Sequence, residues 1–267
     1  MAAKHHILRW ERGQPTREFP DDLADEEPLE IRVNNHAVSV TMRTPGHDEE
    51  LAAGFLLSEG MIRSTLDVLH IAPCVAARDG NVINVQLSPE TKVDLQKLTR
   101  HVFMSSSCGV CGKASIDSVH QQFDPIEPDD FRIDVETLQS LPDALRKSQA
   151  TFDKTGGLHA AGLFDASGKL LVAREDVGRH NAVDKVLGWA LRGGLLPLGR
   201  QVLLVSGRAS FEIMQKALAG RIPVLAAVSA PSRLAVDFAR ESGQTLVGFL
   251  RPGRMNVYSN GHRVGGL

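Results

Sequence analysis

The second half of the chain alternates short apolar runs with amphipathic stretches. Apolar residues dominate positions 201–206, 223–229 and 245–250. Between them, residues 210–219 and 232–241 carry apolar side chains three or four positions apart, which is the spacing of one helix face. Strands that alternate with helices of this length predict a parallel sheet with helices on its faces.

The same alternation begins further upstream. Residues 158–164 and 169–174 are predicted to be strands, and a helix is predicted over 179–192, where two glycines follow. Residues 135–150 have a helical pattern that Pro142 interrupts, which predicts a break or the start of a second helix.

The first half has a different pattern. Residues 29–42 alternate as a hairpin does, residues 48–63 have helical spacing, and two strands are predicted over 69–76 and 81–87. A helix is predicted over 113–122. Prolines at 125 and 128 then indicate a linker.

These patterns predict an α/β protein with a layered sheet. We expect residues 1–28, which are polar and acidic, to form a poorly ordered tail or an edge segment. We expect residues 29–128 to form a smaller α+β part that carries the C-x-x-C, and residues 129–267 to form an α/β domain with a pocket for an anionic cofactor.

Composition excludes several classes of protein. The formal net charge of −2 does not favour a nucleic-acid partner, and no apolar run reaches the ~20 residues of a membrane helix. The first residues lack the apolar stretch of a secretion signal. Three cysteines are too few for a disulfide scaffold and suit a reducing compartment, so we expect a cytoplasmic protein.

Two of the cysteines give the first indication of chemistry. Cys108 and Cys111 form a C-x-x-C in a stretch rich in serine and glycine, with Lys113 close behind. A nearby cation and a helix N-terminus both favour the thiolate. Such a pair can exchange a disulfide, bind a metal or carry a persulfide, and two purely structural thiols are the remaining alternative.

A zinc site is one of these alternatives. His47, Asp48 and Glu49 form an H-x-E upstream of the C-x-x-C, which resembles the motif pair of zinc deaminases. However, serine rather than proline precedes Cys108, and the two motifs are unusually far apart. The chain has no second C-x-x-C that could complete a structural zinc site. We therefore expect no permanently bound metal.

Small residues and arginines follow three successive predicted strands. Ligands of open α/β sheets bind beyond the carboxyl ends of the strands, and helix N-termini there attract anions. The pattern therefore predicts a pocket for a phosphorylated, nucleotide-like ligand. The alternative is that these arginines are unrelated surface residues near helix ends. The residues concerned are Ser206, Gly207, Arg208, Ser229, Arg233, Arg251, Pro252, Gly253 and Arg254.

A third polar group lies between a predicted strand and a helix. Residues 174–181 combine two acids, two arginines, a histidine and an amide, as in a polar binding loop. Single histidines such as His159 and His180 are more often structural than catalytic, so this pattern assigns neither a role in proton transfer.

Taken together, the motifs resemble the FdhD family, the sulfur-carrier accessory proteins of formate dehydrogenase. They occur in order along most of the chain, which is far more specific than the C-x-x-C alone. The matching stretches are residues 43–51 (RTPGHDEEL), 106–112 (SSCGVCG), 155–159 (TGGLH), 175–185 (EDVGRHNAVDK), 205–208 (VSGR) and 249–254 (FLRPGR).

The resemblance implies a sulfurtransferase with a fold related to cytidine deaminases in its C-terminal domain. Such a protein takes sulfur from a cysteine desulfurase as a cysteine persulfide. It passes the sulfur to the bis-guanine-dinucleotide molybdenum cofactor before insertion into the formate dehydrogenase apoenzyme. The resemblance also implies a homodimer and binding of a guanine nucleotide such as GDP.

The resemblance also implies roles for residues. Cys108 is the expected persulfide carrier and Cys111 its partner. Two other classes of function stay open: a non-catalytic chaperone that binds the cofactor, and a zinc-dependent deaminase-like hydrolase. The expected cofactor-binding residues are Phe249, Leu250, Arg251, Pro252, Gly253, Arg254, Ser206, Gly207, Arg208, Ser229, Arg233 and His180.

Overall fold

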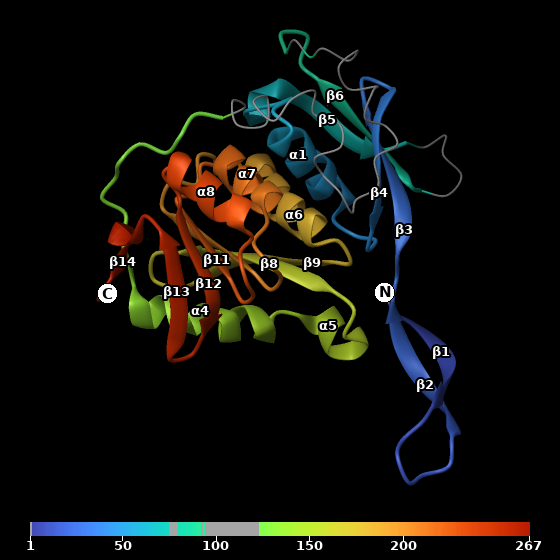
Figure 1. Cartoon of the computed structure of the whole chain (residues 1–267). Helices are drawn as coiled ribbons and strands as arrows, with labels where there is room; N and C mark the ends of the chain where they lie inside the picture. Colours follow the sequence, from blue (N-terminus) through green and yellow to red (C-terminus); the bar gives the residue numbers. More distant parts are fainter. Residues whose placement is uncertain (1, 75–79, 92, 94–122) are drawn as a thin grey trace.

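The computed structural model describes residues 2–74, 80–91, 93 and 123–267. Its larger body is built on a six-stranded sheet with the order β13-β12-β11-β10-β8-β9 (Figure 1). The strands are β8 (His159–Asp165), β9 (Leu170–Asp176), β10 (Gln201–Val205), β11 (Val224–Ala227), β12 (Thr245–Arg251) and β13 (Arg254–Ser259).

The sheet is parallel at its centre and antiparallel at both sides. β10 pairs with β11 and β11 with β12 in parallel, as the alternating pattern predicts. β8 is antiparallel to both β9 and β10, and β13 is antiparallel to β12. Tight turns join β8 to β9 and β12 to β13, and such turns can only connect antiparallel strands. The sequence pattern did not predict β13.

Helices cover both faces of this sheet (Figure 1). One face carries α6 (Arg179–Arg192), α7 (Phe211–Ala219) and α8 (Arg233–Glu241), and the other carries α4 (Val135–Lys147). These match the predicted helices closely, but α4 continues through Pro142. Its buried leucines at 138, 141 and 145 pack on the sheet, and this burial outweighs the cost of the proline.

The smaller part has its own sheet with the order β4-β3-β6-β5. Asn34 and Asn35 turn the chain between β3 and β4 with positive φ, a conformation that asparagine tolerates well. The predicted hairpin, helix and two strands are all present, but the helix ends at Ser58 instead of residue 63 and the first strand ends at Pro73. Their bounds are β3 (Glu27–Val33), β4 (His36–Arg43), α1 (Asp48–Ser58), β5 (Val68–Pro73) and β6 (Val82–Leu87).

Helix α1 joins the two parts because it packs directly against α6. A Cβ on Gly54 would lie 1.8 Å from the carbonyl oxygen of Asp184, and a Cβ on Gly188 would lie 1.8 Å from that of Glu50. The two backbones therefore touch where the helices cross. One continuous hydrophobic core includes side chains from both parts, such as Leu29 and Leu203.

The N-terminal residues differ from the expected loose tail. β1 (Ala2–Arg9) and β2 (Arg17–Ala24) form an antiparallel hairpin that projects from the body (Figure 1). Ile7 is paired with Phe19, and the guanidinium of Arg9 lies 3.6 Å from the centre of the Phe19 ring. The many polar residues in this part of the sequence obscured the alternating pattern of the two strands.

Short elements complete the described fold. They are η1 (Thr65–Asp67), β7 (Ile133–Asp134), α5 (Ala150–Thr155), η3 (Gly261–Arg263) and β14 (Val264–Gly265). None of the described helices is long and apolar enough to cross a membrane. The helix predicted over 113–122 lies outside the described residues.

Candidate functional site

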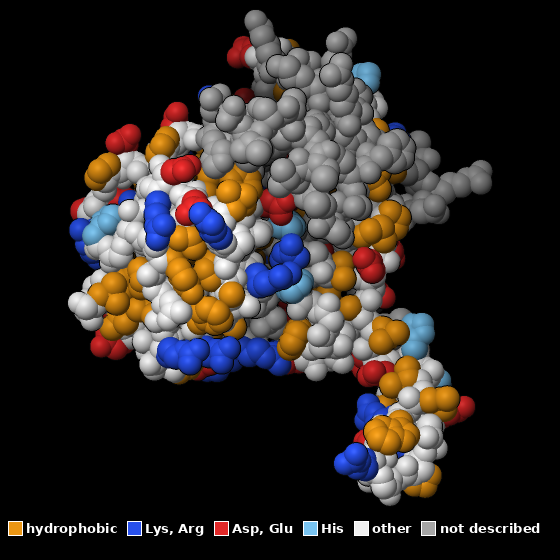
Figure 2. Space-filling view, in the orientation of Figure 1, with side chains coloured by type: hydrophobic (Ala, Val, Ile, Leu, Met, Phe, Trp, Pro, Cys, Tyr) orange, Lys and Arg blue, Asp and Glu red, His pale blue; other side chains and the backbone are white. Residues whose placement is uncertain are grey.

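Four strands end at the same edge of the large sheet. β9 runs in the direction of β10, β11 and β12, because β8 is antiparallel to both of its neighbours. The segments that follow these strands therefore lie along one edge, as the sequence predicts. In Figure 2, Lys and Arg side chains form a row along the lower edge of the body, where Figure 1 places the turn between β12 and β13.

The segment after β10 is fixed to the start of β8. The backbone NH of Ser206 donates to the carbonyl of Ala160, and the Ser206 hydroxyl accepts from the NH of Ala160 at 2.9 Å. Gly207 then passes close to His159, since a Cβ there would lie 3.3 Å from the imidazole Nδ1. Ser206 and Gly207 therefore shape the edge, and the exposed Arg208 follows them.

Basic side chains from three elements converge beside Gly207. Burial lowers the pKa of His159 below its ordinary value, and the charges of Arg179, His180 and Arg208 lower it further. His159 is therefore neutral at neutral pH, and its neighbours give this part of the edge a positive charge. The sequence did not single out Arg179 as a binding residue, although the density of polar groups in residues 174–181 indicated the loop.

His180 is held by an acidic residue on the next helix. Its Nε2 lies 2.8 Å from the carboxylate of Glu212 and 3.3 Å from the hydroxyl of Ser210. The hydrogen bond from His180 is the main cause that lowers the pKa of Glu212, and the nearby positive charges of Lys216 and Arg179 contribute. His180 is thus anchored at the edge, at the beginning of α6.

The segment after β11 is hydrogen-bonded to β12 and leads to an exposed arginine at the beginning of α8. The carbonyl of Ser229 accepts the NH of Phe249, which has a positive φ of 51°. The Ser232 hydroxyl caps α8 by accepting from the NH of Ala235. The side chain of Arg233 is 96 % exposed, and Asp237 lies 3.6 Å away. Arg233 is therefore accessible to a ligand.

The turn between β12 and β13 contains the FLRPGR stretch. Leu250 is fully buried in the core beside α4, so its side chain packs inside the protein. Arg251, Pro252, Gly253 and Arg254 are exposed, as the predicted role requires. The NH of Gly253 donates to the side chain of Gln139 on α4, which fixes the turn.

A buried ion pair supports the loop that begins α6. Asp176 and Lys185 lie 2.7 Å apart and are almost completely buried. Asp176 also accepts from the backbone NH groups of Gly178 and Thr44 and from the Asn181 amide. The pair therefore fixes the loop before α6 against the segment that leads into α1. The sequence motif contains both residues but gives no sign that they are paired.

His47 and Glu49 of the H-x-E motif are engaged with other side chains in the structure. The Nδ1 of His47 lies 3.4 Å from Glu50, which also forms a two-point contact with Arg174. Glu49 pairs with Arg192 on α6. The described residues contain no cluster of three metal-ligating side chains, while Cys108 and Cys111 lie outside them.

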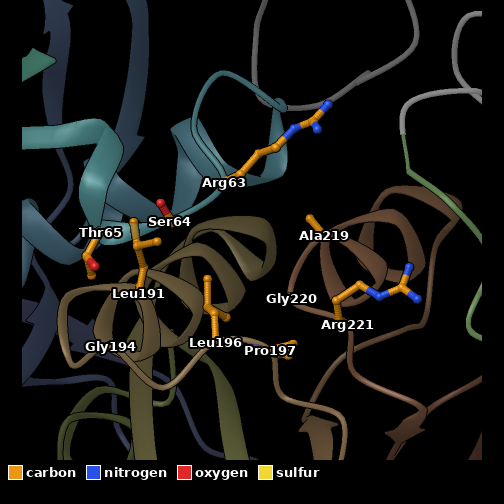
Figure 3. A pocket seen from close by; sticks show the side chains of 10 residues that line it. All are labelled: Arg63, Ser64, Thr65, Leu191, Gly194, Leu196, Pro197, Ala219, Gly220 and Arg221. Carbon is orange, nitrogen blue, oxygen red and sulfur yellow. The ribbon is translucent and has the colours of Figure 1, made fainter. Parts of the chain in front are cut away.

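A cavity of about 200 Å³ lies at the opposite edge of the large sheet (Figure 3). It is formed at the C-terminal ends of α6 and α7, with one side closed by the segment before β5. None of the residues expected to bind the cofactor lines it. The lining residues are Arg63, Ser64, Thr65, Leu191, Gly194, Leu196, Pro197, Ala219, Gly220 and Arg221.

Comparison with known proteins identifies close relatives along nearly the whole chain. The sulfur carrier protein FdhD of Streptomyces avermitilis is 56 % identical and covers 92 % of this chain and 89 % of its own. The sulfur carrier protein FdhD of Mycobacterium tuberculosis is 54 % identical, with 98 % and 99 % covered.

The fold is also found in a solved structure. A crystal structure of a Desulfotalea psychrophila protein, described as a formate dehydrogenase accessory protein, matches with a TM-score of 0.80 and 27 % identity. The match covers 98 % of this chain and 99 % of the other. The sequence profile of the FdhD/NarQ family matches residues 24–265. With a profile that spans both sheets and with sulfur carrier proteins more than half identical to it, this chain belongs to the FdhD/NarQ family.

Proposed function

We propose that the protein carries sulfur as a persulfide on Cys108 from a cysteine desulfurase to a molybdenum cofactor. The acceptor is the bis-guanine-dinucleotide form, and the recipient enzyme is a formate dehydrogenase. The observation that carries the proposal is the family match, whose matched range of residues 24–265 contains the C-x-x-C. The names of the relatives as sulfur carrier proteins support the same role.

The chemistry requires two thiols with different tasks. The Cys108 thiolate attacks the outer sulfur of the donor persulfide, so a new S–S bond forms and the donor cysteine leaves as a thiolate. The Cys111 thiolate then attacks the inner sulfur of the Cys108 persulfide. This step releases hydrosulfide to the acceptor and leaves a Cys108–Cys111 disulfide, which a cellular dithiol reductant must reduce.

The basic edge of the large sheet supports binding of an anionic dinucleotide. Arg208, Arg233, Arg251 and Arg254 are exposed there, and arginine is well suited to phosphate recognition. We expect the guanine nucleotide to bind along this edge, near the turn between β12 and β13. The proposed location is the cytoplasm, where the desulfurase and the apoenzyme are made, and the proposed assembly is a homodimer.

The proposal predicts sulfur loading that depends on one cysteine. After incubation with a cysteine desulfurase and cysteine, the intact protein should gain the mass of one sulfur atom. Cys108→Ala should abolish the gain, while Cys74→Ser should keep it. Cys74 is a suitable control because it lies half-buried at the end of β5, where its backbone NH donates to Val82.

The same experiment distinguishes the alternative function. A wild-type protein that gains no sulfur, under conditions where a known acceptor is loaded, would indicate a cofactor-binding chaperone. Formate dehydrogenase activation by a Cys108→Ser, Cys111→Ser protein would indicate the same. Activation that requires both thiols supports the carrier.

A further inference from the structure

The N-terminal hairpin is a very small sheet for a segment that stands away from the body. β1 and β2 pair with each other, and no third strand joins them within the described part of the chain. Two-stranded hairpins are at best marginally stable in water, and independent sheets need three or more strands. The body adds little support, because the hairpin projects from it and meets it mainly at α5 (Figure 1). The arrangement therefore indicates support from outside the single chain.

The two edges of the hairpin differ in how well they can accept another strand. Pro20 lies in the middle of β2 and has no backbone NH to donate, so it protects that edge. Helix α5 also contacts β2 more extensively than β1. β1 runs over eight residues without a proline. Since an unpaired strand presents a row of NH and carbonyl groups, β1 is the edge to which a further strand can be added.

The hairpin also exposes large apolar side chains. Leu8 is 73 % exposed and Trp10 is 71 % exposed, and Leu23 on the other strand is 44 % exposed. Figure 2 shows apolar side chains over the surface of the hairpin. Several such residues on one small element are typical of a surface that contacts a partner, and tryptophan contributes strongly to binding at such surfaces.

Charge is divided along the hairpin in a way that identifies the partner. The tip, defined as residues 9–17, carries three arginines and a single acidic residue, Glu11. The acidic segment, defined as residues 18–26, carries five acidic residues and neither lysine nor arginine. A second hairpin that runs in the opposite direction would place a basic tip near an acidic segment at both ends of the contact. The hairpin is therefore complementary in charge to another copy of itself.

We propose that two copies of the chain associate through their hairpins, with β1 of each copy paired antiparallel to β1 of the other. The result is a four-stranded sheet about a two-fold axis, in which both copies use the same surface. This inference rests on the homodimer of the proposed function and adds the place where the copies meet. The family profile begins at residue 24, so membership of the family does not by itself define this contact.

The test reverses the charge of each half of the contact separately. The tip variant is Arg12→Glu, Arg17→Glu, and the acidic-segment variant is Asp21→Lys, Glu26→Lys. None of these four side chains is buried, so the changes leave the core intact. Sedimentation velocity of the full-length proteins over a series of concentrations measures how strongly each one associates with itself and with the other.

A matched control changes the same charges on the body. Arg200→Glu, Arg240→Glu alters the net charge as much as the tip variant does. Both arginines are exposed and form only surface ion pairs, Arg200 with Asp130 and Arg240 with Asp237. This control should associate as the wild type does.

We expect the wild type to dimerise with a dissociation constant on the order of micromolar, because paired hairpins bury less surface than a standard interface. Each hairpin variant alone should associate about tenfold more weakly, or less than that. An equimolar mixture of the two variants should form a dimer of near wild-type affinity, because each tip again faces a segment of opposite charge. Deletion of residues 1–22 should give a folded monomer.

Three results would overturn the contact. A wild type that remains monomeric contradicts it and would leave a different protein as the partner of the hairpin. A dimer that persists after deletion of residues 1–22 would place the contact on the body. A mixture that associates no better than its separate variants would show that the tip and the acidic segment do not face each other.

Failure of this inference can be told from failure of the proposed function. Sulfur loading of Cys108 in a wild type that stays monomeric would leave the carrier function standing and remove the hairpin contact. Association through the hairpins without sulfur loading would do the reverse.

Discussion

Two glycines determine how closely the two parts of the protein approach. At Gly54 and Gly188, any side chain would enter the backbone of the facing helix, where the nearest carbonyl oxygen lies 1.8 Å from the added Cβ. Such a contact cannot be relieved by rotating a side chain, because the obstacle is backbone. The helices must separate, and the surrounding core must loosen with them.

We therefore expect Gly54→Ala and Gly188→Ala each to lower the free energy of unfolding by ~3 kcal/mol or more, the upper range for overpacked cores. Urea denaturation followed by circular dichroism measures this. Gly199→Ala is the control, since a Cβ there meets no atom within 4 Å. Equal stability of Gly54→Ala and Gly199→Ala would contradict the close helix contact.

At the scale of elements, one buried arginine links the C-terminal segment to two other segments of the fold. Arg263 in η3 pairs with Asp129 at 2.9 Å and donates to the carbonyl of Gly243. Burial alone would raise the pKa of Asp129, but hydrogen bonds and charge from Arg263, with the NH of Phe131, outweigh it and lower the pKa. The carboxylate form is therefore favoured by the folded state.

This lowered pKa predicts a pH dependence of stability. The contribution of Asp129 is present above the pKa of the unfolded chain, about 3.9, and is lost as the pH falls through the lower folded pKa. Asp129→Asn should lower the free energy of unfolding by about 2–3 kcal/mol at pH 7. The difference from wild type should shrink below pH 4 in urea titrations. A difference that persists unchanged at the lowest pH would contradict the ion pair as its cause.

Most elements could be predicted because their patterns are strong and local. Helices over 179–192, 210–219 and 232–241 show clear helical spacing between apolar runs, and the structure has them within a residue or two at each end. Pro142 was misleading because tertiary packing of α4 overrides a local signal. β13 and the first hairpin were missed because half of the side chains in each strand are polar and the apolar ones form no long run.

The site could be predicted only in part. The clustering of residues after several strands follows from topology, so Arg208, Arg233 and Arg254 were predicted from strand order alone. Leu250 was assigned to cofactor binding only because it lies within the FLRPGR motif, but its side chain belongs to the core. The Asp176–Lys185 ion pair could not be recognised, because partners across the fold are not visible in a single sequence.

At the scale of the whole molecule, the N-terminal hairpin is nearly independent. β1 and β2 pair with each other, and the hairpin reaches the rest of the described structure mainly at α5 and the glycine turn after it, where Ala24 lies next to Gly157. Leu8 and Trp10 on the hairpin are more than two-thirds exposed. The hairpin therefore contributes little burial to the core of the body.

Deletion of residues 1–22 should leave the rest folded. We expect the melting temperature to change by less than about 4 °C, which corresponds to about 1 kcal/mol for a chain of this size. Scanning calorimetry of the truncated and full-length proteins measures the change. Loss of the cooperative transition would show that the hairpin stabilises the body.

The contact between α1 and α6 has a consequence for synthesis on the ribosome. α1 ends at Ser58, and its partner helix begins only at Arg179. At ~5–20 residues per second, translation of the intervening chain takes ~6–24 s. During that time the apolar side chains of α1 emerge without the surface that later covers them. We therefore expect chaperone binding to the nascent chain to be strongest after α1 has emerged and before α6 has been made.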